Sequence, residues 1–263
     1  MSDSYSLRSI DSDLSKMIEV PAGHLAIAYL GQAGFCLKTQ SGRMLAIDPY
    51  LSDCVDRIAG FKRMIPSVLS PEHLDADIML ATHSHPDHLD EDALPVFAKR
   101  PNMFFVGAGD CKSLYQSSGI PASRYAILRD GEEIRIKDIL IRATYADHGT
   151  LSPEAVGYLI SIDGINIYNV GDSAYAPDRI RESLGNVAID VMIAPINGAY
   201  GNLNAKEACM LAALLKPKIL IASHFWMFVE HGGDPALFLE ESKRLSGIKS
   251  IVMAPGEVMI VEV

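Results

Sequence analysis

The sequence predicts an α/β protein, a mixed sandwich with β-sheets inside and helices outside. Three observations predict this fold class. The 263-residue chain is 49% hydrophobic and 21% charged, the balance of a globular protein that can bury a large core. Short β-branched or aliphatic segments recur along most of its length, and turns such as Ser41-Gly42, Asp163-Gly164 and Pro255-Gly256 separate several of them. Helical patterns lie between the later segments, as expected when helices cover sheets.

Each expected strand is a short apolar or β-branched run bounded by polar or turn residues. In chain order the expected strands are His24–Leu30, Phe35–Thr39, Arg43–Asp48, Ile78–Thr82, Met103–Val106, Glu133–Ile136, Ile139–Tyr145, Val156–Ile162, Ile165–Val170, Asp190–Ala194, Ile219–Ser223, Ser250–Ala254 and Glu257–Val261.

Two helices carry clear start signals. Asn204, followed three residues later by Glu207, has the pattern of a capping box and predicts a helix over Ala205–Leu215, which ends before a proline. Asp234-Pro235 supplies an N-cap and a proline at the first helical position, for a helix that runs to about Leu245. Weaker patterns predict helices over Glu91–Lys99 and Asp110–Ser117.

Composition and charge narrow the possible partners. The chain has no repeat or long linker, so we expect one domain over residues 1–263. A formal net charge of −10 and a pI near 5.2 disfavour nucleic acid, although bound divalent cations would still allow an anionic small molecule. No apolar run approaches the ~18 residues of a membrane-spanning helix. Met1–Val20 lacks the pattern of a signal peptide, and the four scattered cysteines read as reduced thiols, so we expect a cytoplasmic protein.

The segment Thr82–His88 is the strongest functional signal. Its sequence is Thr-His-Ser-His-Pro-Asp-His, and it follows the apolar run Ile78–Ala81. His83 and His85 project to the same side of an extended chain because side chains alternate along a strand. Pro86 turns the chain, so Asp87 and His88 can point back to the same region. Imidazole nitrogen and carboxylate oxygen are ligands of zinc, manganese and iron, so this cluster predicts a metal site rather than a solvated loop.

Three further residues of ligand type each follow an apolar strand. His148 follows Ile139–Tyr145, Asp172 follows Ile165–Val170, and His224 follows Ile219–Ser223. Taken singly, each has an ordinary explanation as a hydrogen-bonded strand end or a turn residue. Sites in open α/β sheets lie beyond the carboxyl ends of strands, so the recurrence favours ligands over three coincidences.

The order H-x-H-x-D-H, then His, then Gly-Asp, then His resembles the metallo-β-lactamase superfamily over nearly the whole chain. Within it, four stretches resemble the L-ascorbate-6-phosphate lactonase-like branch: Leu30–Phe35, 47–52, 195–198 and 223–225 with Gly233-Asp234-Pro235 behind it. The resemblance implies a four-layer αβ/βα sandwich and a hydrolase that attacks its substrate with a metal-bound hydroxide. It also implies two divalent ions, zinc or manganese with iron as a further option, and a tendency to form homo-oligomers.

The resemblance also assigns roles to single residues. His83, His85 and His148 should hold one metal, and a second group should hold the other: Asp87, His88 and His224. Asp172 should bridge the two ions. Asp48, in the Ile-Asp-Pro stretch, should orient a ligating histidine by accepting its other N–H. Asp87 or Asp172 is expected to hold the proton of the nucleophile as well.

Other residues have two readings. Arg57, Lys62 and Arg63, between Tyr50 and Pro71, are either binders of a substrate phosphate or carboxylate or solvated cations. Tyr200 and Asn202 precede a helix start and could meet an anion, although a turn-and-cap role is favoured. His231 could reach the substrate, although a surface position is favoured.

The motif leaves the reaction open. A small lactone or related ester, with or without a phosphate group, is the leading substrate. The alternatives are a phosphodiesterase for a small phosphorylated compound and, from another class, a non-catalytic metal-binding regulatory module. Removing the loop Arg57–Arg63 should impair only anionic substrates if that loop binds them.

Overall fold

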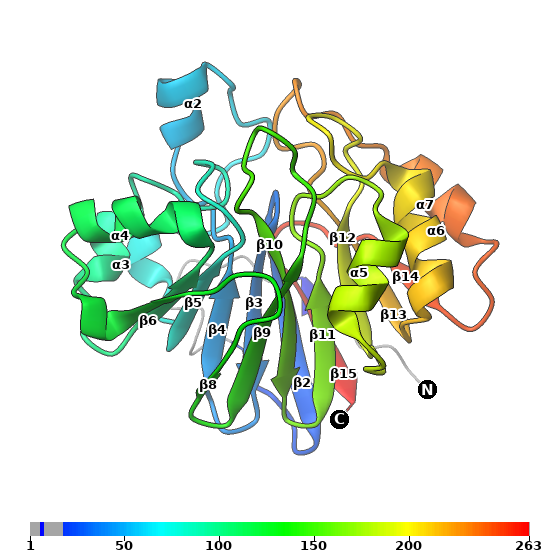
Figure 1. Ribbon diagram of the computed structural model, residues 1–263, viewed down its shortest axis with the longest axis horizontal. Helices are drawn as coiled ribbons and strands as arrows, with labels where there is room; N and C mark the ends of the chain where they lie inside the picture. The colour runs from blue at the N-terminus through cyan, green and yellow to red at the C-terminus, as the bar shows by residue number, and fades with distance from the viewer. Residues whose placement is uncertain (1–5, 8–17, 263) are drawn as a thin grey trace. The chain divides into compact units, whose positions relative to one another are not determined.

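The computed structural model describes residues 6–7 and 18–262, and its strands form two mixed sheets (Figure 1). Each sheet belongs to one compact unit. Unit 1 comprises Met1–Gly107, Cys111–Ile127 and Ala254–Val263, and unit 2 comprises Ala108–Asp110 and Leu128–Met253. Most of Met1–Val20, on which the signal-peptide expectation rests, lies outside the described residues. Among the described helices, none is long and apolar enough to cross a bilayer.

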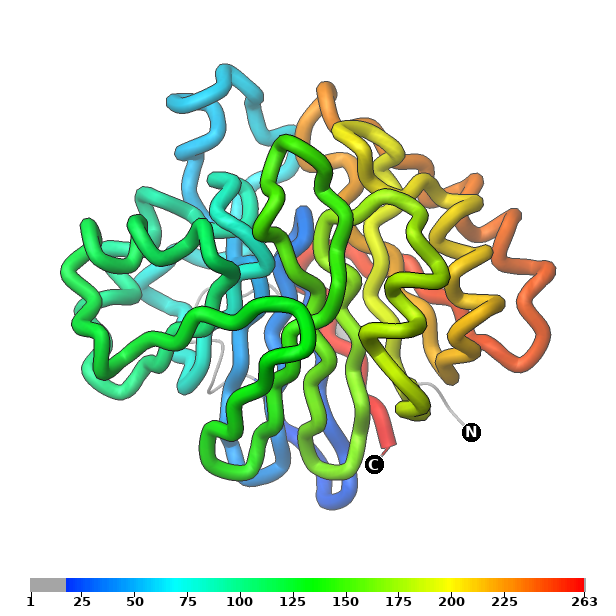
Figure 2. The backbone as a smooth tube through the Cα atoms, viewed as in Figure 1, coloured from blue at the N-terminus to red at the C-terminus, as the bar shows by residue number. Residues whose placement is uncertain are grey.

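The sheet of unit 1 has the strand order β1-β15-β2-β3-β4-β5-β6-β7. Pairing is antiparallel from β1 to β4 and parallel from β4 to β7. The last strand therefore lies beside one of the first, as the red and blue segments of Figure 2 show. The bounds are β1 (Ser6–Leu7), β2 (His24–Gly31), β3 (Gly34–Thr39), β4 (Met44–Ile47), β5 (Ile78–Ala81), β6 (Phe104–Gly107), β7 (Tyr125–Ile127) and β15 (Glu257–Glu262).

The parallel part of this sheet brings several strand ends to one edge. β4 and β5 are buried along their whole length, as expected for parallel strands covered on both faces. Because they run parallel, the residues that follow Ile47 and Ala81 emerge side by side. The helical segments of unit 1 are short: α2 (Cys54–Ala59), η1 (Pro71–His73), α3 (Leu94–Ala98), α4 (Lys112–Ser117) and η3 (Ala122–Arg124).

The sheet of unit 2 has the order β14-β13-β12-β11-β10-β9-β8. It is antiparallel from β8 to β11 and parallel from β11 to β14. Strands β9, β11, β12 and β13 consequently share one direction, and their carboxyl ends lie at one edge. The bounds are β8 (Glu133–Ile136), β9 (Ile139–Tyr145), β10 (Val156–Ile162), β11 (Ile165–Asn169), β12 (Val191–Pro195), β13 (Ile219–Ser223) and β14 (Lys249–Ile251).

Three helices accompany this sheet: α5 (Pro177–Leu184), α6 (Ala205–Leu215) and α7 (Pro235–Ser242). α5 contacts β9, α6 contacts β12, and α7 contacts both α6 and β14. The capping box of α6 is confirmed, since Asn204 Oδ1 accepts from Glu207 N and Glu207 Oε2 accepts from Asn204 N, both at 3.0 Å. Asp234 caps α7 by accepting from Ala236 N and Leu237 N.

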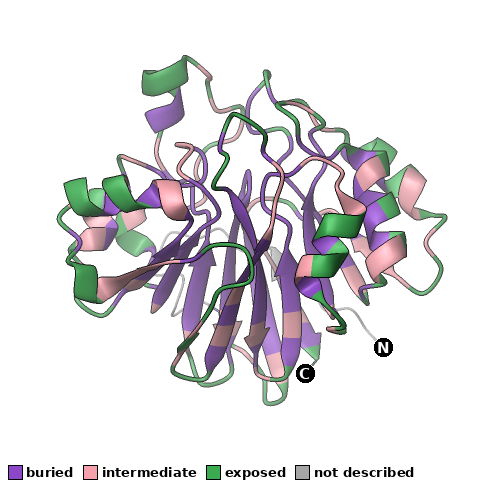
Figure 3. Cartoon of the chain, in the orientation of Figure 1, coloured by how far each residue is buried: buried purple, intermediate pink, exposed green. Residues whose placement is uncertain are grey.

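The strands hold the core of each unit, as the buried residues in Figure 3 show. Twelve of the thirteen expected strands agree with the structure to within one residue at each end. The expected strand Ser250–Ala254 is wrong at its end, because β14 stops at Ile251. The helix expected to run to about Leu245 ends at Ser242. The helix expected over Glu91–Lys99 is present only as the shorter α3. The helix expected over Asp110–Ser117 consists of a 3₁₀ helix, η2 (Gly109–Cys111), followed by α4.

Six described elements were not expected: β1, β7, α2, α5 and the two 3₁₀ helices η1 and η3. The segment Tyr50–Pro71 is therefore not all loop. α2 has only six residues, too few to show a helical period, and it ends at Gly60, whose φ of 76° stops the helix. α5 did carry a signal, because Pro177 stands at its first position.

Candidate metal centre

In unit 1, four ligand-type side chains follow strand β5. His83, Asp87 and His88 are buried, and His85 is half-buried. His83 Nε2 and His85 Nδ1 lie 2.9 Å apart, and the ring centroids of His83 and His88 are 4.1 Å apart. The chain turns after Pro86 because the N–H groups of His88 and Leu89 both donate to His85 O. The expected convergence of this segment is therefore present within unit 1.

Asp48 lies beneath this cluster, directly after β4. Its backbone is left-handed, with φ of 45°, and its side chain is fully buried. Asp48 Oδ1 accepts from Thr82 N at 2.8 Å, and Oδ2 accepts from Thr82 Oγ1 at 2.7 Å. Oδ2 also accepts from His88 Nδ1 at 2.8 Å. An acceptor at Nδ1 fixes the His88 tautomer so that Nε2 carries the lone pair that a metal needs.

Gln32 is a site residue that the sequence did not single out. It follows β2, has a left-handed backbone with φ of 53°, and is fully buried. Gln32 Nε2 donates to Asp87 Oδ2 at 2.7 Å, and the same carboxylate oxygen lies 3.6 Å from His88 Nε2. The signal was a single amide in the apolar turn Leu30–Gly34, but its partner is 55 residues away in the chain.

In unit 2, Asp172 is the centre of a second buried group at the carboxyl ends of the strands. Its Oδ2 lies 3.3 Å from His224 Nε2 and 3.8 Å from His148 Nε2. Asn202 Nδ2 donates to the same oxygen at 2.7 Å. All four side chains are buried. Asn202 therefore does more than shape a turn, because its amide orients this carboxylate.

A series of ring contacts within unit 2 begins at His224. His231 stacks on His224, with ring centroids 5.0 Å apart and planes 11° apart. Phe228 and Tyr200 contact the His231 ring at centroid distances of 4.8 and 5.1 Å. The favoured surface reading of His231 is wrong, because this residue is only 8% exposed. Tyr200 is 45% exposed.

The donor sets of the two units fit divalent metal ions. Two atoms that coordinate one tetrahedral ion at about 2.1 Å lie roughly 3.4 Å apart. The carboxylate–imidazole separations are 3.6 Å in unit 1 and 3.3 and 3.8 Å in unit 2. Each group consists of buried or half-buried histidine and aspartate side chains without a thiolate, a donor chemistry that suits zinc, manganese or iron. The clusters are therefore able to bind metal ions.

Two of the three basic residues of the segment Tyr50–Pro71 have protein partners. Arg57, on α2, pairs with Asp92 at 2.7 Å on the surface. The Arg63 side chain is buried, so the interpretation as a solvated cation is wrong. The interpretation as a substrate-binding residue stays a prediction. The Arg63 guanidinium donates to the carbonyls of Tyr50, Ser52 and Ile65 and lies 4.5 Å from the centroid of the Tyr50 ring. Lys62 is exposed.

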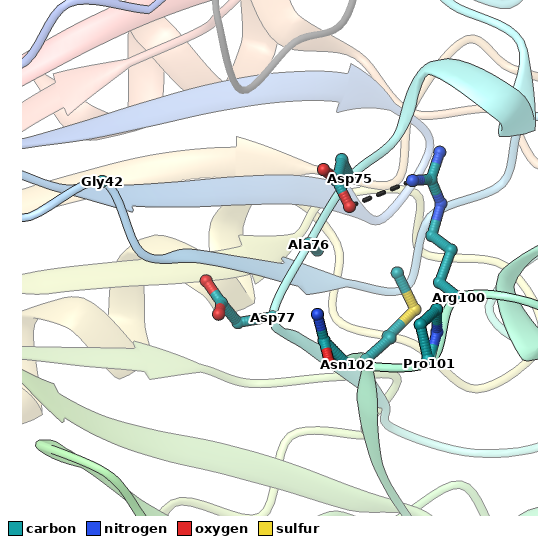
Figure 4. A pocket seen from close by; sticks show the side chains of 8 residues that line it. Gly42, Asp75, Ala76, Asp77, Arg100, Pro101 and Asn102 are labelled. Atoms are coloured by element: carbon teal, nitrogen blue, oxygen red, sulfur yellow. Dashed lines mark hydrogen bonds and ion pairs between the residues drawn. The ribbon is translucent and has the colours of Figure 1, made fainter.

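Unit 1 also has a cavity of about 260 Å³ at the amino ends of β4, β5 and β6 (Figure 4). An Asp75–Arg100 pair at 3.0 Å lies on one side of it. Asp77 Oδ2 accepts from Met44 N at 3.0 Å and so joins two strand starts. This cavity lies at the strand ends opposite to His83 and contains no histidine, so we assign it a structural role.

Comparisons with known proteins support the family suggested by the motif. A family model described as a beta-lactamase superfamily domain matches residues 26–224. A UPF0173 metal-dependent hydrolase of Thermococcus onnurineus is 29% identical over 241 residues, which cover 89% of this chain and 98% of the relative. The "Probable L-ascorbate-6-phosphate lactonase UlaG" of Salmonella heidelberg is 26% identical, with 82% of this chain and 74% of the relative covered.

Solved structures show the same fold. Igni18, a metallo hydrolase from the archaeon Ignicoccus hospitalis, is similar with a TM-score of 0.71 and 24% identity, and the match covers 91% of this chain and 99% of Igni18. This likeness confirms the predicted α/β sandwich of the metallo-β-lactamase type. Because the family model spans most of the sequence, the chain belongs to the beta-lactamase superfamily of metal-dependent hydrolases.

Proposed function

We propose that this protein hydrolyses a small lactone or related carboxylic ester at a two-metal site. The observation that supports the proposal most is the set of polar atoms around the Asp172 carboxylate. A buried carboxylate oxygen lies 3.3 and 3.8 Å from two imidazole nitrogens and is oriented by an amide. Such an arrangement is costly without a cation to compensate the charge and is suited to holding one.

The ligand assignment follows the family motif. His83, His85 and His148 would hold one ion, and a second group would hold the other: Asp87, His88 and His224. Asp172 would bridge the ions. The donor types favour zinc or manganese, with iron as a further option. When bound, the ions would supply Lewis acidity and lower the pKa of a water molecule towards neutrality.

The chain's own residues have distinct tasks in this proposal. Asp87 and Asp172 would hold the proton of the attacking water, each kept in orientation by one amide donor. Asp48 accepts the Nδ1 proton of His88 and so keeps Nε2 available as a ligand atom. Burial of the carboxylates excludes water from one side and strengthens their interactions with nearby charge.

A lactone is preferred over a phosphodiester for two reasons. The lactonase of Salmonella heidelberg is a relative over most of this chain, whereas no observation specifically favours phosphodiester cleavage. Of the three candidates for a phosphate contact, Arg57 pairs with Asp92 and Arg63 donates to main-chain carbonyls, which leaves the exposed Lys62. Every proposed ligand position carries a competent residue, which argues against a decayed site and so favours catalysis over a regulatory metal-binding module.

The test is metal content by elemental mass spectrometry on protein purified without chelator or nickel. Reconstitution with each metal and assays on lactones and phosphodiesters follow. We expect about two ions per chain and lactone hydrolysis. Asp172→Ala and His85→Ala should lose metal and activity together while circular dichroism stays unchanged. His73→Ala, at an exposed histidine, is the control.

Three outcomes would contradict the proposal. A fully active, metal-free Asp172→Ala variant would remove the mechanism. Failure to take up any metal at micromolar concentration would make the constellation structural. Stoichiometric metal without hydrolysis of either substrate class would favour the regulatory module.

A further inference from the structure

The turn 198–203 of unit 2 is fastened to the aspartate of the metal centre. Leu203 N donates to Ser173 O at 2.8 Å, and the Asn202 side chain donates to Asp172 Oδ2 at 2.7 Å. Gly198 N closes the turn by donating to Leu203 O at 3.0 Å. The position of this turn is therefore set by the residues that would hold metal.

Tyr200 stands at the tip of the turn in an unfavourable backbone conformation. Its φ is 53°, in the left-handed region that bulky residues rarely adopt, and Gly201 beside it is also left-handed. Strained backbone of this kind is found mostly where it serves a function. Here it keeps a large ring 45% exposed.

The exposed ring is linked to a ligand histidine by two ring contacts. Tyr200 lies 5.1 Å from His231, centroid to centroid, at an interplanar angle of 59°. His231 in turn stacks on His224. Phe228 packs edge-on against His231 and holds it in place. A substrate whose reacting group lies near His224 would therefore meet an aromatic surface beside it.

The segments that carry the unit 2 ligands contain no basic residue of their own, although Arg179 of α5 lies 4.4 Å from the centroid of the Tyr145 ring. Segments 145–152, 170–176, 195–204 and 223–234 contain no lysine or arginine, whereas they contain three acidic residues besides the ligand Asp172: Asp147, Glu230 and Asp234. A phosphate on the substrate would find no cationic side chain on these segments. The side chains of these segments would instead contribute apolar and aromatic contacts, so that any attraction of an anion would have to come from bound metal ions.

We propose that Tyr200 contacts the substrate and selects uncharged lactones or esters that carry an apolar ring next to the scissile bond. This inference rests on the proposed function and names its substrate class. It separates this protein from an enzyme for phosphorylated lactones.

The test compares three γ-lactones on the metal-loaded enzyme: one with a phenyl substituent, one with a methyl group and one with a phosphomethyl group. The phenyl lactone should have the highest kcat/KM. Tyr200→Ala should lower the phenyl-to-methyl ratio of kcat/KM about tenfold, mainly through KM, because a contact made equally in ground and transition states affects binding. Tyr200→Phe should keep the ratio. Leu237→Ala, at an exposed apolar residue on α7, is the control.

Equal losses on all three lactones in Tyr200→Ala, or a preference of the wild type for the phosphomethyl lactone, would overturn the inference. If the metal-loaded wild type hydrolyses no lactone, the proposed function fails, and calorimetric binding of the matching phenyl and methyl lactams then tests Tyr200 alone. A loss of phenyl-lactam affinity of about tenfold in Tyr200→Ala supports the contact, and unchanged affinity overturns it.

Discussion

The Asn202 side-chain amide donates a hydrogen bond of 2.7 Å to Oδ2 of Asp172, and it does so in a buried position. Unit 1 contains the same device, since Gln32 donates to Asp87 Oδ2 at 2.7 Å. In each unit a neutral amide from a neighbouring turn orients the aspartate. An amide holds the carboxylate without a positive charge that would repel a divalent cation, which is the requirement of a metal site.

Asn202→Ala should weaken metal affinity by roughly 10–100-fold, the usual effect of removing a group that orients a metal ligand. Asp172 would then lose its donor and adopt several rotamers. Chelator competition monitored by a metal-sensitive dye measures the change. Asn102→Ala, in an exposed turn of unit 1, provides the matched control. Unaltered affinity in Asn202→Ala would mean that the hydrogen bond does not orient the ligand.

Substitution of Asp48 should affect the stability of the fold as well as the metal. Asp48→Ala removes the acceptor of Thr82 N, Thr82 Oγ1 and His88 Nδ1 and should cost about 3 kcal/mol or more in the free energy of unfolding. Alanine also tolerates the φ of 45° poorly. Asp48→Asn keeps the shape and accepts that backbone, so it should cost about 1 kcal/mol. Urea denaturation distinguishes the two, and equal costs would contradict this account.

The site was predictable where ligands are local in sequence or lie at strand ends. The ligands from His83 to His88 fall within six residues: alternation along an extended chain groups His83 with His85, and the turn at Pro86 brings Asp87 and His88 back to them. Gln32 was not predictable because its contact depends on a turn and on a partner far away in the chain. The surface reading of His231 failed for a similar reason, since its burial depends on stacking against His224 and Phe228.

Two neighbouring glycines behind His224 should respond differently to substitution. A Cβ at Gly233 would lie 2.6 Å from Phe225 Cβ and 3.0 Å from Phe225 Cα, whereas one at Gly232 would meet only Asn197 O at 3.7 Å. Both positions are left-handed. Gly232→Ala should therefore lower the free energy of unfolding by about 1 kcal/mol, from backbone strain alone. Gly233→Ala should cost at least twice that, because Phe225 must move next to His224. Urea denaturation measures both, and the reverse order would contradict the loop geometry.

Arg63 should matter for stability and not for the choice of substrate. Arg63→Lys should lower the free energy of unfolding by about 1–3 kcal/mol, because one ammonium group cannot donate to the carbonyls of Tyr50, Ser52 and Ile65 together. Arg57→Ala breaks only an exposed pair and should cost less than about 1 kcal/mol. Neither change should alter the ratio of activity on phosphorylated and neutral substrates. A selective loss on the phosphorylated compound would return these residues to a substrate-binding role.

The buried thiols should make the protein less stable in alkali. Burial, assisted by Asp90, raises the pKa of Cys54 to about 12, and burial, assisted by Glu241, raises that of Cys209 to about 11. The unfolded chain releases these protons near pH 9, while the folded protein retains them. The stabilising contribution is therefore complete below pH 9 and is lost as the pH rises from there towards 11 or 12. In that window each thiol lowers the free energy of unfolding by about 1.4 kcal/mol per pH unit.

Urea denaturation at pH 8.5, 9.5 and 10.5, at fixed metal concentration, should show a shallower slope of unfolding free energy against pH in Cys54→Ala than in the wild type. Identical slopes would mean that the Cys54 thiol ionises in the folded protein as readily as in the unfolded chain.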